Sequence, residues 1–230
     1  MGLTVLSAGA VKGGVVQIAA AFGHDHNHVV TTEFTQVPKL QKRLTDGEVV
    51  DVVVATQGAM DDLAKHGKIA EATRGVVGRS RLGIIVHKDA PATDVSDAEA
   101  FKRAVLAASC VVHNDASSGL YIAGLLEKLG LTAQLGNRLV MISGGPAMLS
   151  TLSERGPGTM GLAQMSAIRA MIASGSAVKL AGPLPDAIQN VSTYQAAAMT
   201  ASAAPEAAAA LARALTADAA KPVFAATGID

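Results

Sequence analysis

The chain has 230 residues, of which 50% are apolar and 3% aromatic, and its 19 Lys and Arg balance its 19 Asp and Glu. This length fits one large α/β domain or two lobes of about 100 residues each, and the apolar half suffices for a core, which excludes a disordered chain. Zero formal net charge argues against a sequence-independent nucleic-acid binder or a polybasic membrane-surface protein, because both need clustered Lys and Arg.

The first third of the chain alternates short β-rich or unbroken apolar runs with helical segments. The predicted strands are 3–7, 28–34 and 49–55, and the predicted helices are 10–22, 37–46 and 58–66. The run 49–55 is typical of a strand buried on both faces of a sheet. This β-α-β order predicts a mostly parallel sheet with right-handed crossovers.

A second set of elements follows. The predicted strands are 82–87, 110–114, 139–143, 160–164, 178–181 and 194–200, and the predicted helices are 97–108, 119–129, 146–154, 165–173 and 205–219. Ser96 is the expected N-cap of the helix at 97–108. Pro205 suits the first turn of the last helix.

The N-terminal segment has no signal-peptide pattern, because the first basic residue is Lys12 and a strand is predicted before it. No run of about 18 apolar residues exists, so we expect no transmembrane helix. The sequence as written indicates a cytoplasmic protein, or a periplasmic one if Met1 replaces a removed signal.

Four strand-to-helix turns carry small or hydroxyl residues at the same structural point. They are 7–10 (SAGA), 55–58 (ATQG), 114–119 (NDASSG) and 143–146 (SGGP). Each turn is expected to place free backbone N–H groups and a helix N-terminus at the carboxyl edge of a parallel sheet. Because α/β folds bind ligands at that edge, the four turns predict an anion site.

Named catalytic motifs are missing from these turns. The segment 9–14 (GAVKGG) is neither a dinucleotide fingerprint nor a P-loop, and no serine lies in G-x-S-x-G. Lys12 follows the first turn and could face an anion. His113 ends a predicted strand beside the third turn, which makes it the best histidine candidate.

Metal and cofactor sites are not predicted. His24, His26 and His28 would share one face of an extended segment and could bind zinc or nickel. The segment is instead expected to be a polar surface loop at the edge opposite the four turns. Cys110, the single cysteine, excludes an intrachain disulfide and a multi-cysteine metal site, and we expect it to be buried packing.

Four segments carry a resemblance to a known family. They are 3–9 (LTVLSAG), 51–56 (DVVVAT), 114–121 (NDASSGLY) and 161–164 (GLAQ). With the order of elements over essentially the whole chain, they resemble the molybdate-binding branch of the type II periplasmic solute-binding proteins. The same branch includes proteins similar to aconitate isomerase.

The resemblance implies an α/β fold of two lobes with mostly parallel sheets and two crossover strands. Residues 1–82 and 183–230 would form lobe one and residues 83–182 lobe two, with the ligand in the cleft between them. The turns and the resemblance together predict ligand contacts from Ser7, Gly9, Thr56, Gln57, Ala116, Ser117, Ser118, Gly145 and Gln164.

Two functions follow from the resemblance. The first is a monomeric binding protein for a small anion, a di- or tricarboxylate more than molybdate, with an ABC transporter permease as the implied partner. The second is an isomerase that moves an allylic proton, which needs a base and amide donors for the developing charge. His113, Lys12 and Tyr121 are the candidate bases. Neither function needs a cofactor, and neither predicts nucleic-acid binding or stable membrane insertion.

Overall fold

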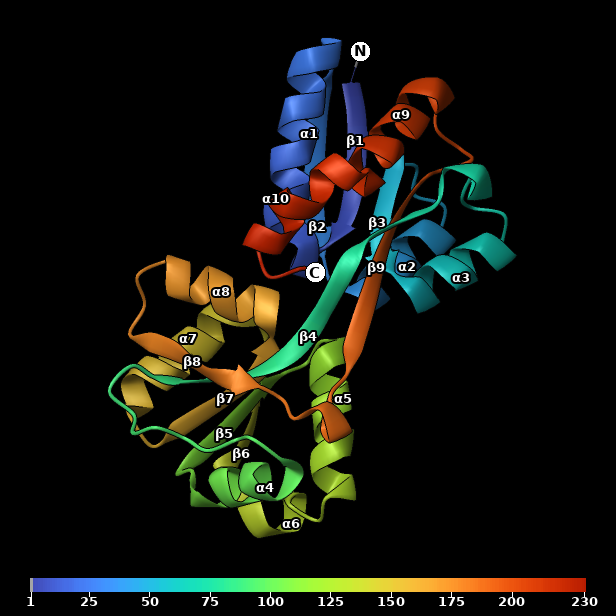
Figure 1. The fold of residues 1–230 in the computed structure, drawn as a ribbon. Helices are drawn as coiled ribbons and strands as arrows, with labels where there is room; N and C mark the ends of the chain where they lie inside the picture. The colour runs from blue at the N-terminus through green and yellow to red at the C-terminus, as the bar shows by residue number, and fades with distance from the viewer. Residues whose placement is uncertain (1) are drawn as a thin grey trace. The chain divides into compact units, whose positions relative to one another are not determined.

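The computed structural model describes residues 2–230, and the chain divides into two compact units (Figure 1). The first unit holds the chain up to Ser80 together with Ser192–Asp230, and the second holds Arg81–Val191. The strands β4 (Gly75–His87) and β9 (Val191–Ala198) contain the points where the chain passes from one unit to the other. Both units have a sheet with helices on its two faces.

The first unit is built on a sheet with the strand order β2-β1-β3-β9. The strand β1 is parallel to both β2 and β3, whereas β9 is antiparallel to β3. The remaining strands are β1 (Gly2–Ala8), β2 (Val29–Thr35) and β3 (Val52–Thr56). The helices are α1 (Lys12–His26), α2 (Val37–Thr45), α3 (Gln57–Lys65), α9 (Pro205–Thr216) and α10 (Lys221–Ala226).

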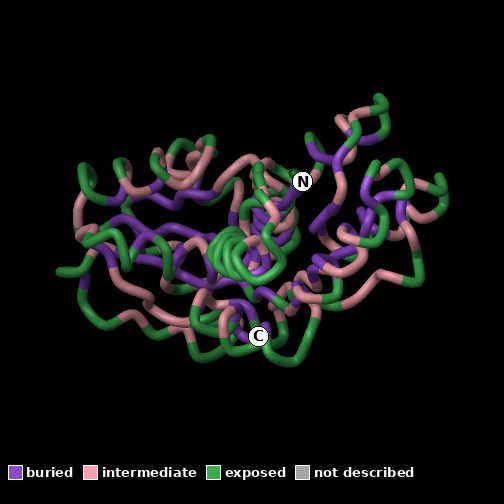
Figure 2. Tube along the Cα trace, turned by 90° about the horizontal axis from the view of Figure 1, so that it is seen from above, coloured by how far each residue is buried: buried purple, intermediate pink, exposed green. Residues whose placement is uncertain are grey.

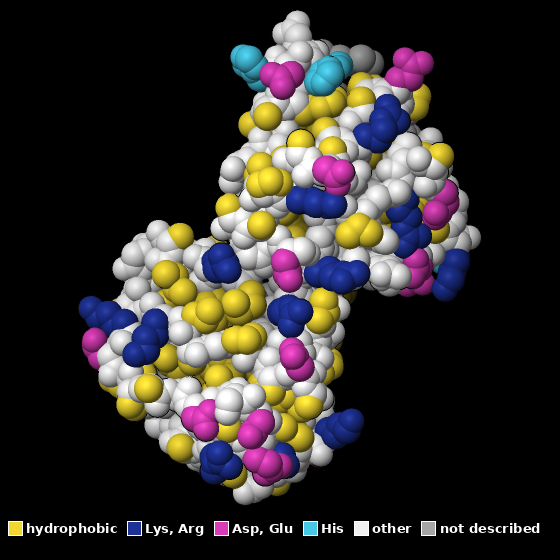
Figure 3. All heavy atoms as spheres, in the orientation of Figure 1, with side chains coloured by type: hydrophobic (Ala, Val, Ile, Leu, Met, Phe, Trp, Pro, Cys, Tyr) yellow, Lys and Arg dark blue, Asp and Glu magenta, His cyan; other side chains and the backbone are white. Residues whose placement is uncertain are grey.

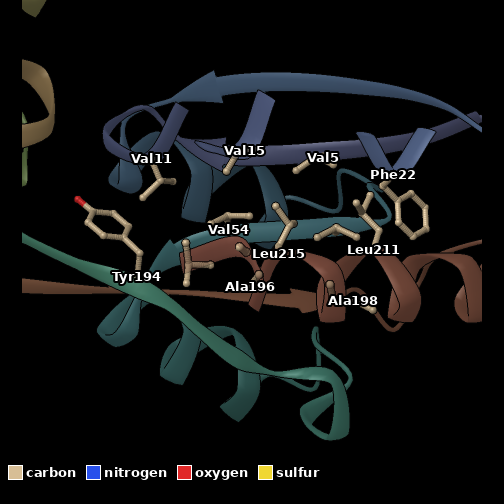
Figure 4. Packing of buried hydrophobic residues seen from close by; sticks show 14 of the residues in the cluster. Val5, Val11, Val15, Phe22, Val54, Tyr194, Ala196, Ala198, Leu211 and Leu215 are labelled. Carbon is tan, nitrogen blue, oxygen red and sulfur yellow. The ribbon is translucent and has the colours of Figure 1, made fainter. Parts of the chain in front are cut away.

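The core of the first unit lies in two layers, one on each face of its sheet. One layer packs α1, α9 and α10 against the strands, and Figure 4 shows Leu215 of α9 near Val54 and Leu211 near Phe22. The other layer belongs to α2 and α3. Full burial of a side chain such as Leu211 stabilises the fold by roughly 1.5–3 kcal/mol. A Cβ on Gly14 would overlap the ring of Phe224, so glycine at this position lets α1 and α10 approach closely.

The second unit has its own sheet with the path β4-β7-β5-β6, and β8 pairs with the free side of β4. The strands β5, β6 and β7 are parallel, whereas β4 is antiparallel to β7 and β8. The strands are β5 (Cys110–Asn114), β6 (Leu139–Ile142), β7 (Thr159–Gln164) and β8 (Val178–Pro183). The helices are α4 (Ala98–Ala107), α5 (Ser117–Lys128), α6 (Thr132–Leu135), α7 (Gly144–Arg155) and α8 (Met165–Ala173).

Burial follows the strands in both units. Figure 2 shows buried stretches along the strands and exposed residues on the outer sides of helices. In the second unit, α4, α5 and α6 cover one core layer, and α7 and α8 cover the other. Cys110 is buried in the latter layer, as the sequence predicts.

Strand β4 is the largest departure from the sequence prediction, which places a strand only over 82–87. The strand begins seven residues earlier, at Gly75. Glycines and exposed arginines interrupt the apolar pattern there, so pairing with neighbouring strands decides the conformation. The antiparallel β4, β8 and β9 also make the sheets mixed, and less parallel than the sequence predicts.

Two helix boundaries also differ. Helix α1 continues to His26, so His24 and His26 lie in its last turn and not in an extended loop. Asn27 ends the helix in the left-handed conformation, with φ of 54°. The N-cap of α4 is Asp97 and not Ser96, because Asp97 Oδ1 accepts the Ala100 N–H at 2.8 Å. The short helices α6 and α10 are not predicted, since neither has a long apolar period.

Candidate anion-binding turns

In the first unit, three parallel strands end at one edge of the sheet. Ser7 of β1 lies beside Val54 of β3 and Phe34 of β2. Thr56 ends β3, and Gln57 opens α3 directly after it. The structure therefore brings the predicted residues of the first two turns to the same edge of this unit. Gly9 follows as the exposed first residue of a 3-10 turn, Gly9–Val11, whose Val11 is buried.

Ser7 is fully buried at the end of β1. Its hydroxyl donates to the carbonyl oxygen of Ala8 at 3.1 Å. That bond is local, and a hydroxyl proton can rotate toward another acceptor. Ser7 can therefore donate to a ligand oxygen without disturbing the sheet.

In the second unit, β5, β6 and β7 end at one edge. His113 lies beside Leu162 of β7, and Asn114 lies beside Ile142 of β6. Helix α8 begins directly after β7, α7 begins two residues after the last residue of β6, and α5 begins three residues after the last residue of β5. Ser117, Gly145 and Gln164 consequently lie at the same edge of this unit. The sequence predicts this location, because strand-to-helix turns are expected at the carboxyl edge of a parallel sheet.

The helices that begin at these two edges have no side-chain N-cap. The residues before α3, α5, α7 and α8 have extended backbone and form no capping hydrogen bond. Helix α2 is also uncapped but carries Pro38, which has no N–H. Elsewhere, α4 is capped by Asp97, α9 and α10 have a proline in the first turn, and the four-residue α6 lacks both. Free N–H groups thus gather at the strand-end edges.

The turn between β5 and α5 is shaped by Asn114. Its Oδ1 accepts the Ala116 N–H at 3.1 Å and lies 3.5 Å from Ser118 Oγ. A Cβ on Gly119 would overlap the carbonyl oxygen of Asn114, so this tight turn requires glycine there. Ser117 is exposed, whereas Ser118 is buried. The N–H groups of the first turn of α5 face the edge with small side chains around them.

The β7-to-α8 turn contains a residue that sequence reasoning did not single out. Gln164 ends β7 and is 6% exposed. Ser166, in the first turn of α8, is equally buried, and its hydroxyl has no hydrogen-bond partner among residues 2–230. Because Ser166 is the second residue of α8, it lies beside the end of β7 at the strand-end edge. Its place two residues after Gln164 is the signal that could have identified it.

Among the three candidate bases, His113 is buried in the second unit. Its Nδ1 lies 3.0 Å from the carbonyl oxygen of Asn114. A carbonyl can only accept, so Nδ1 carries the proton of a neutral ring and Nε2 holds the lone pair. Nε2 is therefore the atom that could take a proton.

Tyr121 and Lys12 have other contacts. The Tyr121 hydroxyl donates toward the carbonyl oxygens of Ile188 at 3.3 Å and Gln189 at 3.5 Å, which ties α5 to the segment before β9. Lys12 is exposed, and its Nζ lies 5.5 Å from the centre of the Phe34 ring. Lys12 therefore lies near the strand ends of the first unit, where an anion could attract it.

Two further residues at the edge of the first unit are not evident from the sequence. Tyr194 of β9 lies opposite Thr56, and Figure 4 shows its hydroxyl pointing away from the apolar cluster. Arg74 donates twice to Gln195 Oε1, at 2.8 and 2.6 Å, and also to Asp61 of α3. The antiparallel pairing of β9 with β3 brings Tyr194 and Gln195 to the end of β3, and the side chain of Arg74 is held there by Gln195.

Charged and metal-ligating side chains within residues 2–230 form no metal site. Figure 3 shows acidic and basic side chains interspersed over the visible face. Within residues 2–230, no group of three or more His, Cys, Asp and Glu is placed to hold a metal ion. His24 Nδ1 instead contacts Asp25 Oδ1 at 3.0 Å, and the rings of Phe22 and His26 lie 4.3 Å apart.

Comparison with known proteins decides the family. The model of the bacterial extracellular solute-binding proteins matches residues 3–230. The chain belongs to this family. The predicted family and its two-lobed α/β fold are therefore confirmed.

Relatives of this solute-binding protein include one with a named enzymatic activity. Aconitate isomerase from Pseudomonas sp. is 30% identical over 228 residues, which are 96% of this chain and 85% of that protein. Among solved structures, the periplasmic molybdate-binding protein of Azotobacter vinelandii has a TM-score of 0.78 at 18% identity, covering 99% of this chain and 98% of that chain.

Two more structures share the fold. The sulfate-binding protein SubI from Mycobacterium tuberculosis has a TM-score of 0.77 at 16% identity, covering 100% of this chain and 86% of that chain. The tungstate ABC transporter structure from Geobacter sulfurreducens has a TM-score of 0.74 at 17% identity, with 97% of each chain covered. In this solute-binding protein, no helix within residues 2–230 is both long and apolar enough to cross a membrane.

Proposed function

We propose that the protein binds a small di- or tricarboxylate through the strand-end turns of its two units. The observation that carries this proposal is the set of uncapped helix N-termini at these edges, with the hydroxyls of Ser7, Ser117 and Ser166 beside them. Free N–H groups at helix N-termini favour anions, and hydroxyls add donors without adding charge.

The ligand class follows from the chemistry of these turns and from the relatives. The turns carry no Lys or Arg, so the donors are neutral and spread over several segments. Such a set suits an anion with several oxygens at separate positions, as in a tricarboxylate. The 30% identical relative is named for aconitate, a tricarboxylate, whereas the molybdate-, sulfate- and tungstate-related structures are below 20% identical.

A thermal-shift and calorimetric screen tests this function. The protein is titrated with cis-aconitate, trans-aconitate, citrate, succinate, molybdate, sulfate and a neutral sugar. Ligand at 100 times its dissociation constant adds about 2.7 kcal/mol, which raises the melting temperature by several degrees. We expect the tricarboxylates to give the largest shifts. Shifts with the sugar alone would refute anion binding, and shifts with molybdate alone would refute the carboxylate.

The partner and location belong to the same proposal. We propose that the protein acts outside the cytoplasmic membrane as a monomer and delivers its ligand to an ABC transporter permease; the family's description as extracellular solute-binding proteins and the ABC transporter components among similar structures support this role. Light scattering of the ligand-bound protein should give the mass of one chain. A stable dimer would contradict the monomer while leaving the binding function testable.

Isomerisation is the second candidate function, and the aconitate isomerase relative is the observation that favours it. The proposed step is a 1,3-proton shift: a base removes a proton from the methylene carbon, the double bond moves by one position, and a proton returns to the former vinylic carbon. His113 Nε2 is the proposed base, and the N–H groups of α5 would stabilise the developing carboxylate charge.

Incubation with cis- or trans-aconitate in heavy water tests the isomerase. An active enzyme places deuterium on an allylic carbon and interconverts the isomers. His113→Ala should remove most of this exchange, whereas His66→Ala, on an exposed helix end, should not. Tight binding without deuterium uptake would refute the isomerase and retain the binding protein.

A further inference from the structure

The second unit contains a cavity that the strand-end turns do not use. It has a volume of about 500 Å³ and lies between the loop after β4, helix α4 and the start of β7. The predicted anion turns follow the ends of β5, β6 and β7, whereas this cavity touches Met160 at the beginning of β7. The two locations are therefore at opposite ends of the same sheet.

The wall of the cavity is mainly apolar. Its lining includes Val86, Ala90, Pro91, Ala104, Pro157 and Met160. The α4 residues in the lining, such as Ala100, Ala104 and Ala107, share one helix face, and their small side chains leave the space open. A volume of this size falls within the range of small-molecule pockets, about 300–1,000 Å³.

The backbone around the cavity is already hydrogen-bonded. The Ala90 carbonyl accepts from Lys179 Nζ at 2.6 Å, and the Ala90 N–H donates to His87 at 3.0 Å. The Ala108 carbonyl accepts from Arg138 at 2.7 Å. Thr159 differs from these groups: it also lines the cavity and is 1% exposed, and its hydroxyl has no hydrogen-bond partner among residues 2–230, so one unpaired hydroxyl lies in the mainly apolar wall.

One end of the cavity carries two charged side chains, Asp94 and Arg103. Asp94 accepts the Ser96 N–H at 3.1 Å, and hydrogen bonds from Ser96 hold the pKa of the Asp94 carboxyl below its usual range. The nearest contact of Arg103 with Asp94 is 3.9 Å, which leaves guanidinium donors available. Lys179, whose Nζ donates to the Ala90 carbonyl, is not part of the lining. Arg103 is thus the cationic residue of the lining, and a guanidinium pairs well with a carboxylate.

We propose that this cavity binds an amphiphilic monocarboxylate with a hydrocarbon body, distinct from the polar ligand of the strand-end turns. The hydrocarbon would lie against Ala104 and Met160, and the carboxylate would pair with Arg103. The proposal does not depend on the function assigned to the turns.

Octanoate is the probe that tests this site. Calorimetry compares octanoate with acetate, which has the charge without the chain, and with 1-octanol, which has the chain without the charge. Amide chemical shifts of the whole protein then locate the probe. We expect octanoate to bind more tightly than either comparison compound and to shift residues 90–108 and 157–160, also when cis-aconitate is present in excess.

Two variants separate the hydrocarbon and carboxylate contacts. Ala104→Trp fills the cavity and should abolish octanoate binding, with Ala173→Trp on exposed α8 as its control. Arg103→Gln keeps the cavity and should weaken octanoate binding roughly three- to tenfold without changing 1-octanol binding. Arg169→Gln, also exposed, is the matched charge control. Shifts confined to the strand-end turns, or equal affinity of wild type and Arg103→Gln, would overturn the proposal.

Discussion

The two units build their strand-end edges differently. In the second unit, three neighbouring parallel strands are each followed closely by an uncapped helix. In the first unit, β1 leads into a 3-10 turn, α2 carries Pro38, and β9 adds Tyr194 from the antiparallel direction. The second unit therefore offers more backbone donors, whereas the first offers more side chains. Four experiments test how far this difference extends to stability and ligand binding.

Gly119→Ala should have the largest effect. The added Cβ would overlap the Asn114 carbonyl, so the β5-to-α5 turn must shift or unfold. We expect a loss of at least about 3 kcal/mol in unfolding free energy, measured by urea denaturation. Gly124→Ala in the same helix meets nothing within 4 Å and should stabilise by about 0.5–1 kcal/mol. Similar stability of both variants would show that the turn tolerates the overlap.

Leu211→Ala and Leu126→Ala compare the two cores, because both side chains are fully buried. Each should cost about 2–5 kcal/mol through lost contacts and a cavity. Amide hydrogen exchange should lose protection mainly in the mutated unit, since each unit has its own core layers. Equal loss in both units would show that the units unfold as one.

Ser166→Ala separates a ligand donor from a structural hydroxyl. The Ser166 hydroxyl has no partner among residues 2–230, so its removal should leave stability unchanged or raise it slightly. Tricarboxylate affinity should fall about tenfold or more, because a hydrogen bond to a charged group contributes roughly 1.5–3 kcal/mol. Ser153→Ala, exposed on α7, is the control. Lost stability with unchanged affinity would assign Ser166 a structural role.

Arg43→Gln should have the smallest effect and tests the first unit alone. Arg43 donates to Glu33 and Glu48, and its hydrogen bonds hold the pKa of Glu33 below its usual range. A depressed carboxyl pKa adds stability above the unfolded-state pKa, and this stability is lost as pH falls through the folded-state value. The wild type should therefore lose more stability than Arg43→Gln between about pH 5 and 3, in urea titrations with Lys42→Gln as control. Parallel pH profiles would contradict this linkage.

Much of the candidate site is readable from local sequence. Small residues after apolar runs predict the turns at Ser7, Thr56, Ser117 and Gly145, because strand and helix periods change there. Ser166 escapes this reasoning, since only packing shows that its hydroxyl is buried without a partner. The histidines at positions 24 and 26 were expected in a loop because their polar pattern carries no helix period, yet the helix continues to His26.

The sequence by itself determined the alternation of strands and helices, the family and the small-residue turns, since these depend on local periodicity and short motifs. Tertiary structure decided the antiparallel course of β4, β8 and β9, because long-range pairing overrides a broken apolar pattern such as that of β4 before Leu82. It also decided the cavity beside α4, since empty volume depends on how the loop, helix and strand pack together.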